Sequence, residues 1–377
     1  GVNHKKRGWS IKNLFCAGLM GCFIFVMATT SFAQEGDEYF FGLATHRVVN
    51  VWEALFVKSF EWYCEDHGYK CTSMEAGNDP ATQITQVRRM VDMGVDGLVI
   101  GAVESTALIP AVEYAKEHNV PVITANVDIY SPDVLLYIGF SGFESGKILA
   151  EEIVKYLRDE VEPIGEVKGT VLEIRGTMGS ATGEDRHNGF VSVLDEYPEV
   201  RVITVVGDWD MAQAKTAAET VLRAYEVDAI YGGNGPMAMG AVGAIEALGK
   251  NPQDYFVATI DALPEVLEAI GEGKIDVALD QPCPFYTPLA VYYLVEFLEK
   301  GEEALPKPGD IVTAEDVNIE GKIHQGVDIW AHDEMWAPAP VVETEYGHPW
   351  MQTRGILVTK DNYTLESLWA NFELEEW

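Results

Sequence analysis

Short runs of hydrophobic residues alternate with amphipathic segments along most of the chain. FFGLAT (40–45), DGLVIG (96–101) and PVITA (121–125) have the composition of buried strands, and apolar residues between them recur every three or four positions. The alternation resumes with TVLEIR (170–175) and continues to DVAL (276–279). Because apolar strands that alternate with helices are typical of parallel sheets covered on both faces, this pattern predicts an α/β protein.

The alternation falls into two series of similar length, which predicts two Rossmann-like lobes, each built on a parallel sheet. IGFSGF (138–143) and the proline-rich DQPCP (280–284) are the expected crossings between the lobes. The expected ranges are 38–140 plus 282–305 for the first lobe and 141–281 plus 355–377 for the second. From 301 to 354 the periodicity is lost, so we expect 306–354 to be an irregular insertion near the hinge or the cleft.

The first 33 residues have the features of a secretory signal peptide. A basic start, His4 to Arg7, precedes an apolar run that ends at Ala28, and Ser31 and Ala33 are the small residues of a cleavage site. A transmembrane anchor is the alternative, but the run is short for one. LMGC (19–22) also resembles a lipobox, which leaves a lipid anchor on Cys22 open. We expect a periplasmic or otherwise extracytoplasmic protein.

The chain is strongly acidic, with 26 Lys and Arg against 60 Asp and Glu and a formal net charge of −34. Cleavage after residue 33 would remove four cations and no acids, leaving 22 against 60 and a net charge of −38. Nucleic-acid binding depends on cationic contacts with phosphate, so this balance argues against it. A soluble, self-repelling surface is the simpler interpretation.

Three cysteines remain beyond the expected signal peptide, at positions 64, 71 and 283. Cys64 and Cys71 lie seven residues apart, so both a disulfide bond and a pair of free thiols are open. The chain lacks the clustered Cys and His spacing of a zinc site. We therefore expect neither a metal nor a cofactor.

Polar residues follow most of the predicted strands. In a parallel α/β sheet, ligands bind outside the carboxyl ends of the strands, so these residues are candidates for a binding site. The candidates are His46, Asn50, Trp52, Asn126, Asp128, Glu184, Arg186, Trp209, Asn234, Asp261 and Gln281.

Some of these residues also have a simpler structural interpretation. Asn234 and Asp261 each precede a helix and suit an N-cap, as does Asp210, which begins a capping box and is therefore not a candidate. Trp52 and Trp209 suit a core. What favours a site is that both lobes place amides, carboxylates and a tryptophan at the same edge. That combination suits a neutral polyhydroxylated ligand, because amides and carboxylates pair with hydroxyl groups and an indole covers a sugar ring.

Several segments, taken in order, resemble the periplasmic sugar-binding proteins of ABC importers, the type I group that includes ribose-binding protein. The similarity covers about 38–300 and resumes at 355–370. The segments are ATH near Trp52, DGLVIGAVESTALIPAVEYAKEHNVPVITAN, GSATGEDRHNGF, GDWD, GGNGPMAMGAVGAIEALG, ATIDALPEVLEAIGEGKIDVALDQ and ILVTKDN.

The resemblance implies a three-crossing hinge between the lobes and assigns ligand-binding roles to residues of this chain. Its ligand aromatics correspond to Trp52 and Trp209, its strand-end amide and carboxylate to Asn234 and Asp261, and its hinge glutamine to Gln281. Two ligand arginines of ribose-binding protein are absent: Val127 occupies the position of one, and Glu184 that of the other, with Arg186 two residues later. The resemblance therefore does not extend to ribose itself.

These observations predict a monomeric exported protein that binds a monosaccharide or sugar alcohol and delivers it to the membrane permease of an ABC importer. One alternative is a periplasmic sensing subunit that reports to a chemoreceptor or sensor kinase. Another is a carbohydrate hydrolase with Glu184 and Asp261 as acid and base. The chain lacks a nucleophile elbow, a phosphate loop and metal-ligand spacing, which disfavours an enzyme.

Overall fold

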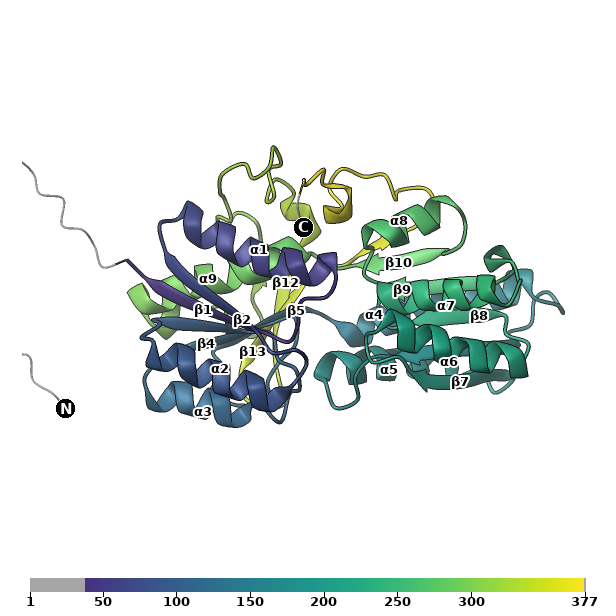
Figure 1. Ribbon diagram of the computed structural model, residues 1–377, viewed down its shortest axis with the longest axis horizontal. Helices are drawn as coiled ribbons and strands as arrows, with labels where there is room; N and C mark the ends of the chain where they lie inside the picture. Colours follow the sequence, from purple (N-terminus) through teal and green to yellow (C-terminus); the bar gives the residue numbers. More distant parts are fainter. Residues whose placement is uncertain (1–37, 376–377) are drawn as a thin grey trace, which may run out of the picture. The chain divides into compact units, whose positions relative to one another are not determined.

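The computed structural model describes residues 38–375, which belong to one compact unit (Figure 1). The predicted signal peptide, its cleavage site and the lipobox cysteine lie outside the described residues. Within 38–375, no helix has both the length and the apolar character needed to cross a bilayer.

The first sheet has eight strands in the order β11-β12-β13-β5-β4-β3-β1-β2. Apolar residues point to both of its faces: Phe41 and Leu43 pack on one side, and Phe40 and Ala44 on the other. Helices α1 and α9 cover one face, and α2 and α3 cover the other (Figure 1). The bounds are β1 Phe40–Thr45, β2 Lys70–Glu75, β3 Gly97–Ile100, β4 Val122–Ala125, β5 Leu136–Phe140, α1 Val51–Asp66, α2 Pro80–Asp92, α3 Ile109–Glu117 and α9 Cys283–Lys300.

The second sheet has six strands in the order β14-β10-β9-β8-β6-β7. Helices α4 and α5 cover one face, and α6 and α7 cover the other. The bounds are β6 Gly169–Arg175, β7 Val200–Val206, β8 Ala229–Gly232, β9 Phe256–Ile260, β10 Val277–Asp280, β14 Ile356–Val358, α4 Gly142–Glu160, α5 Ala181–Leu194, α6 Met211–Ala224, α7 Gly235–Ala247 and α8 Pro264–Gly271.

The two lobes share one topology. The core order β2-β1-β3-β4-β5 of the first sheet recurs as β7-β6-β8-β9-β10 in the second, with all these neighbours parallel. This is the 2-1-3-4-5 order of doubly wound folds. The prediction of two Rossmann-like lobes with parallel sheets is confirmed.

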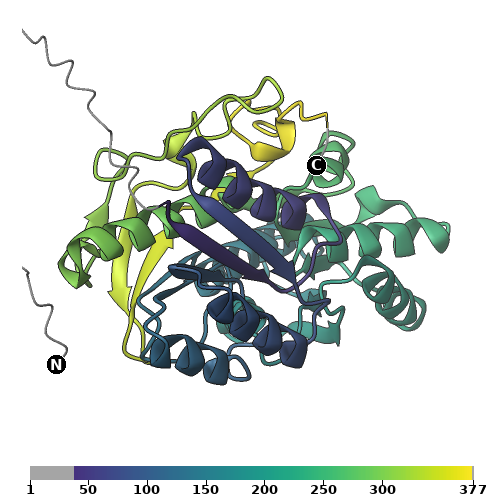
Figure 2. The ribbon, with the colours of Figure 1, turned by 60° about the vertical axis from the view of Figure 1, so that its left-hand side comes forward.

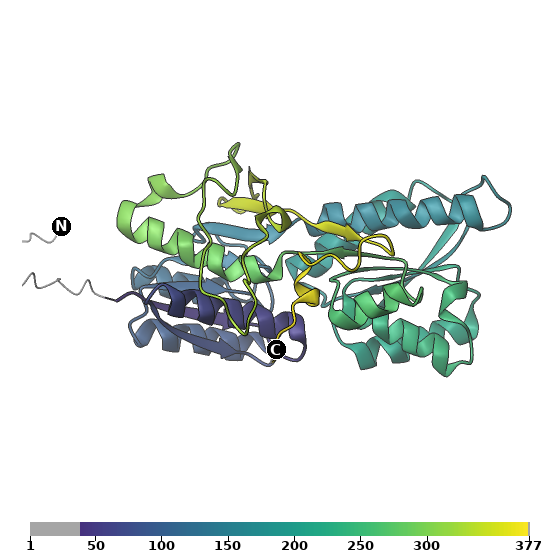
Figure 3. The ribbon, with the colours of Figure 1, turned by 90° about the horizontal axis from the view of Figure 1, so that it is seen from above.

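The chain passes three times between the sheets: from β5 to α4, from β10 to α9, and from β13 to β14. Figure 3 shows the last passage in yellow. The passages lie side by side, because a Cβ atom added at Gly355 would lie 3.3 Å from the Asp280 carbonyl oxygen and 3.4 Å from the Phe140 ring. The three-crossing hinge is therefore confirmed.

The segment 306–354 is not irregular throughout, and this corrects the prediction. It contributes β11 (Ile311–Val312), β12 (Ala339–Glu343) and β13 (Pro349–Thr353) to the edge of the first sheet (Figure 2). Strand β13 runs parallel to β5, more than 200 residues earlier in the chain. These strands are short and two of them contain proline, so they depend on this long-range pairing more than on local propensity.

The rest of the segment is coil apart from short turns. Its Trp330 is buried and donates from Nε1 to the Pro284 carbonyl, 2.8 Å away at the start of α9. The 3₁₀ helices of the described chain are η1 Pro252–Asp254, η2 Glu302–Ala304, η3 Asp333–Met335 and η4 Trp369–Asn371. Cys64, Cys71 and Cys283 are free thiols in this structure.

A buried histidine anchors the β12–β13 hairpin to the loop after β4. His348 Nε2 lies 2.8 Å from Asp128 Oδ2, and its Nδ1 lies 2.8 Å from the Ser131 carbonyl oxygen. Each ring nitrogen therefore has a buried polar partner, one on the carboxylate of Asp128 and one on the backbone of the loop. The side chains of His348 and Asp128 are only 1% and 6% exposed.

We predict that His348→Ala lowers the free energy of unfolding by about 3–5 kcal/mol, because it leaves the Asp128 carboxylate buried without this partner. Urea unfolding measures this change. The matched control is His332→Ala, which breaks an exposed pair with Glu334 and should cost under about 0.5 kcal/mol. Similar losses in both variants would contradict the prediction.

Candidate functional site

A cavity lies between the lobes, at the carboxyl ends of both sheets. Residues of both lobes line it. Nine of the eleven predicted site residues are among them: His46, Asn50, Trp52, Asn126, Arg186, Trp209, Asn234, Asp261 and Gln281. The structure therefore brings together residues that lie up to 235 positions apart.

The start of α1 supplies one part of the first-lobe wall. Asn50 is the N-cap, and its Oδ1 accepts from the Glu53 amide at 3.0 Å. Capping fixes the first turn, which carries Trp52. The indole of Trp52 stacks on Phe56 at 5.5 Å with an interplanar angle of 14°. Trp52 is therefore both a core residue and part of the cavity wall.

Glu53 lines the same wall and was not predicted. Its carboxylate accepts from Arg47 Nε at 3.1 Å and from the Val49 amide at 2.7 Å, and His46 Nε2 lies 3.3 Å away. Burial raises the pKa of Glu53, but the hydrogen bond and charge of His46, the Val49 amide and Arg47 outweigh it, so the pKa lies below its ordinary value. Glu53 is therefore an ionised carboxylate at neutral pH.

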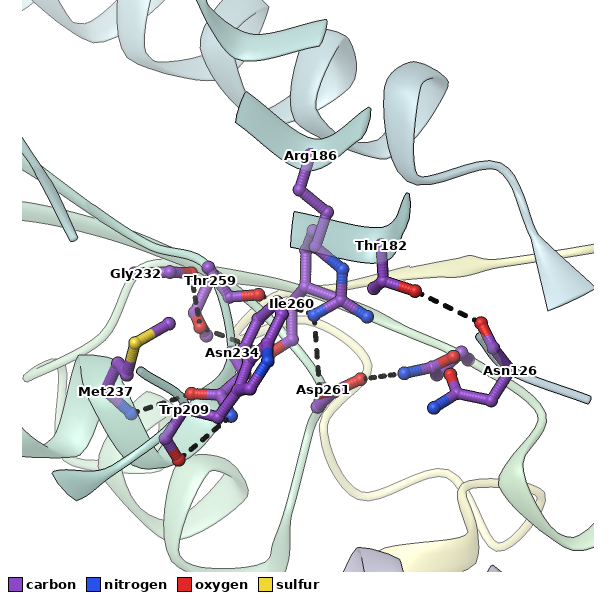
Figure 4. A network of polar contacts seen from close by, with 12 residues as sticks. Asn126, Thr182, Arg186, Trp209, Gly232, Asn234, Met237, Thr259, Ile260 and Asp261 are labelled. Carbon is purple, nitrogen blue, oxygen red and sulfur yellow. Dashed lines mark hydrogen bonds and ion pairs between the residues drawn. The ribbon is translucent and has the colours of Figure 1, made fainter. Parts of the chain in front are cut away.

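A buried ion pair forms the second-lobe wall (Figure 4). Arg186 of α5 donates from Nη1 to the Gly233 carbonyl at 2.6 Å, and the same atom lies 3.7 Å from Asp261 Oδ2. Gln281 Nε2 donates to the other oxygen of Asp261, and Gln281 is held by the Tyr286 hydroxyl at 2.8 Å. Burial raises the pKa of Asp261, and Arg186 and Gln281 only partly offset that rise.

Trp209 and Asn234 lie beside this pair. The Arg186 guanidinium lies over the Trp209 ring, 5.2 Å from a ring centroid. Asn234 Oδ1 caps α7 by accepting from the Met237 amide at 2.9 Å, and its Nδ2 lies 3.5 Å from the Trp209 carbonyl oxygen. Asn234 is therefore a helix cap that also lines the cavity, so the cap interpretation is confirmed and the ligand-binding role stays a prediction.

Four buried polar atoms of the cavity residues have no hydrogen-bond partner among the described residues: His46 Nδ1, Trp52 Nε1, Asn126 Oδ1 and Arg186 Nε. Buried polar groups nearly always have a partner in native proteins. Two of these atoms, the indole and guanidinium nitrogens, are donors, and the amide oxygen is an acceptor. Together they can pair with hydroxyl groups, which both donate and accept.

Asp128 and Glu184, which were also predicted as site residues, are not among the residues that line the cavity. Asp128 accepts from Thr124 Oγ1 at 2.7 Å and pairs with His348, so its carboxylate holds the strand-end loop in place. Glu184 pairs with Arg175 at 2.9 Å within the second lobe. The hydrolase alternative loses its acid–base pair, because only Asp261 of the two carboxylates faces the cavity. Asp210 caps α6, as predicted.

The prediction also missed three other polar residues of the lining, Asn78, Ser180 and Thr182. Ser180 and Thr182 follow β6, where strand-end placement marks them, but Ser180 is also the N-cap of α5. Asn78 follows β2 in a turn of its own, with φ of 64°. The spacing Asn50-x-x-Glu53 is that of a capping box. The sequence therefore indicates a capping role for Glu53 and gives no signal that it also lines the cavity. The remaining lining residues are apolar: Ala102, Val103, Val127, Pro236 and Leu263.

The described residues contain no cluster of three or more His, Cys, Asp or Glu side chains that could hold a metal ion. The cavity lining supplies hydrogen-bonding groups, charged side chains and aromatic faces.

This chain belongs to the periplasmic binding protein domain family, whose model matches residues 41–303. The resemblance to sugar-binding members of this class is confirmed. The chain is 25% identical over 264 residues to the galactofuranose-binding protein YtfQ of Escherichia coli K12, covering 67% of this chain and 76% of that protein. It is 26% identical over 255 residues to the ribose import binding protein RbsB of Bacillus subtilis 168, covering 67% and 80%.

The fold is also that of solved sugar-binding domains. The fructose-binding periplasmic domain of a hybrid two-component system superimposes with a TM-score of 0.69 at 22% identity, covering 88% of this chain and 94% of that domain. The family therefore includes import proteins, and the fold also occurs in a sensor domain.

Asp280 lies at the hinge, directly before Gln281. Its Oδ1 accepts from the Ala262 amide and the Trp369 indole, each at 3.0 Å, while Oδ2 has no hydrogen-bond partner among the described residues. Burial raises the pKa of Asp280 from its ordinary 3.8 to about 8; the Ala262 amide lowers it, Asp261 raises it further, and the Trp369 indole lowers it.

We predict that this carboxyl makes the stability of the fold depend on pH. The folded chain keeps the Asp280 proton up to about pH 8, whereas the unfolded chain releases it near pH 4. The stabilisation is therefore fully present below about pH 4 and is lost as the pH rises through about 8. Asp280→Asn has no such proton, so its free energy of unfolding should rise relative to wild type by about a few kcal/mol across this window.

Denaturant unfolding of both proteins from pH 4 to 8.5 measures this difference. The exposed Asp361 provides the control, because Asp361→Asn should follow the wild-type curve at every pH. A constant offset between wild type and Asp280→Asn would contradict the prediction.

Proposed function

We propose that this protein is an exported solute-binding protein that captures a neutral monosaccharide or sugar alcohol between its lobes and delivers it to the permease of an ABC importer. One observation carries the proposal: a cavity formed by both lobes contains unpartnered donors and an acceptor beside two indoles. Such a wall suits a small molecule with several hydroxyl groups.

The charges of the cavity argue for an uncharged ligand. Arg186 faces Asp261, and Glu53 is paired with Arg47 and lies beside His46, so neither sign of charge is left in excess. A charged ligand would enter a desolvated space without a counter-ion, which is costly. Hydroxyl groups, by contrast, complete hydrogen bonds without adding charge.

Delivery depends on closure of the lobes around the ligand. The ligand touches both walls only when the lobes are closed, so it binds that form more tightly and shifts the population towards it. A permease then distinguishes loaded from empty protein by its shape. The second candidate function is that of a sensing subunit for a chemoreceptor or sensor kinase. The similarity to the periplasmic domain of a two-component system supports this candidate.

The proposal is tested with the full chain purified under native conditions. Native mass spectrometry should detect a retained neutral molecule with the mass of a monosaccharide or polyol. Calorimetric titration of the refolded, ligand-free protein with a panel of neutral sugars, polyols, sugar acids and amino acids should give saturable binding only in the first two groups. Binding confined to the charged compounds would overturn the proposal. Loss of sugar uptake on deletion of the gene would favour transport over sensing.

We predict that Asp261→Ala weakens binding of the best sugar of that panel by more than tenfold, or over ~1.5 kcal/mol, because ligand hydroxyls and Arg186 lose a partner. Calorimetry measures the change. Asp210→Ala is the control: it removes the N-cap of α6 outside the cavity, costing about 1 kcal/mol of stability with affinity unchanged. Unchanged affinity in Asp261→Ala would remove Asp261 from the site.

A further inference from the structure

The first lobe reaches the second through Arg47, which does not line the cavity. Arg47 belongs to the segment between β1 and α1, and its Nη2 donates to the Trp209 carbonyl of the second lobe at 2.9 Å. Its Nε donates to Glu53 Oε1 at 3.1 Å. The guanidinium fork therefore links a carboxylate of the cavity wall with the backbone of the opposite lobe.

The second lobe holds that carbonyl in a defined turn. Asp208 and Trp209 both have positive φ, 54° and 62°, a conformation that residues other than glycine adopt only where surrounding contacts impose it. Thr177 Oγ1 donates to Asp208 Oδ1 at 2.7 Å, and the Asp210 amide donates to the Gly207 carbonyl at 2.9 Å. The acceptor for Arg47 is thus fixed within its own lobe.

A second contact between the lobes also lies outside the cavity lining. Ser105, after β3 of the first lobe, is fully buried, and its Oγ accepts from the Ala181 amide at 3.0 Å. Ala181 is the first residue of α5, where amides have no partner within the helix. The N-cap Ser180 satisfies Gly183, so the first lobe supplies the partner for Ala181.

We propose that Arg47, assisted by Ser105, is a positioning residue that raises the closed fraction of the protein before any ligand is bound. One hydrogen bond to a charged group accounts for about a tenfold change in the ratio of closed to open protein. Because apparent affinity scales with the population of the binding-competent form, this contact also raises affinity without touching the ligand. The effect on affinity depends on the proposed function, whereas the closure itself does not.

The test is small-angle X-ray scattering of the full chain, refolded without ligand and checked by native mass spectrometry. Arg47→Leu should give a larger radius of gyration than wild type. Arg175→Leu is the matched control: both arginine side chains are 11% exposed and paired with a glutamate, but Arg175 and Glu184 belong to one lobe. This variant should scatter like wild type.

Thermal unfolding separates closure from general damage, because an opened but folded Arg47→Leu protein keeps a cooperative transition. Ser105→Ala provides an independent variant if Arg47→Leu does not fold, and it should shift the radius of gyration in the same direction. Superimposable ligand-free scattering curves for wild type and a folded Arg47→Leu or Ser105→Ala variant would overturn the proposal. Since no sugar is present, this result would leave the proposed ligand class untouched.

Discussion

The burial of charge between two facing sheet edges is the constraint on which the rest of this structure depends. Two sheets that meet at their carboxyl ends enclose polar strand ends away from bulk water, and an isolated ion there is costly. The structure meets this cost by pairing Arg186 with Asp261 across the second wall, and Glu53 with Arg47 on the first. The polar atoms that remain without a hydrogen-bond partner are uncharged or belong to a side chain that is already in an ion pair. The cavity is therefore suited to hydroxyl groups.

The same edge also concentrates unusual backbone conformations. Three residues that follow strands have a positive φ: Asn126 (66°), Trp209 (62°) and Asp261 (74°). Side chains other than glycine seldom adopt this region, and it costs free energy that packing must repay. Hydrogen bonds do this at Asn126, whose amide donates to the Ile138 carbonyl at 2.9 Å and whose own carbonyl accepts from the Tyr137 hydroxyl at 2.8 Å. The polar side chains are thereby turned into the cavity.

Elements remote from the cavity keep this arrangement in place. The β12–β13 hairpin extends the first sheet beside β5 and, through His348 and Asp128, holds the loop that carries Asn126. The third crossing packs at Gly355 against the other two, close to Asp280 and Phe140. The hinge that would govern closure is therefore continuous with the edge of the sheet that supports the cavity.

The sequence by itself determined what depends on neighbouring residues: the alternation of strands and helices, the caps at Asp210 and Asn234, and the strand-end placement of most cavity residues. Periodicity and capping act over a few positions, so they are legible in one stretch of chain. Only the tertiary structure decided the roles of Asp128 and Glu184, because their partners, His348 and Arg175, draw their carboxylates away from the cavity. The tertiary structure also decided that β12 and β13 form strands. Strand β13 pairs with β5, a partner that no local sequence pattern specifies.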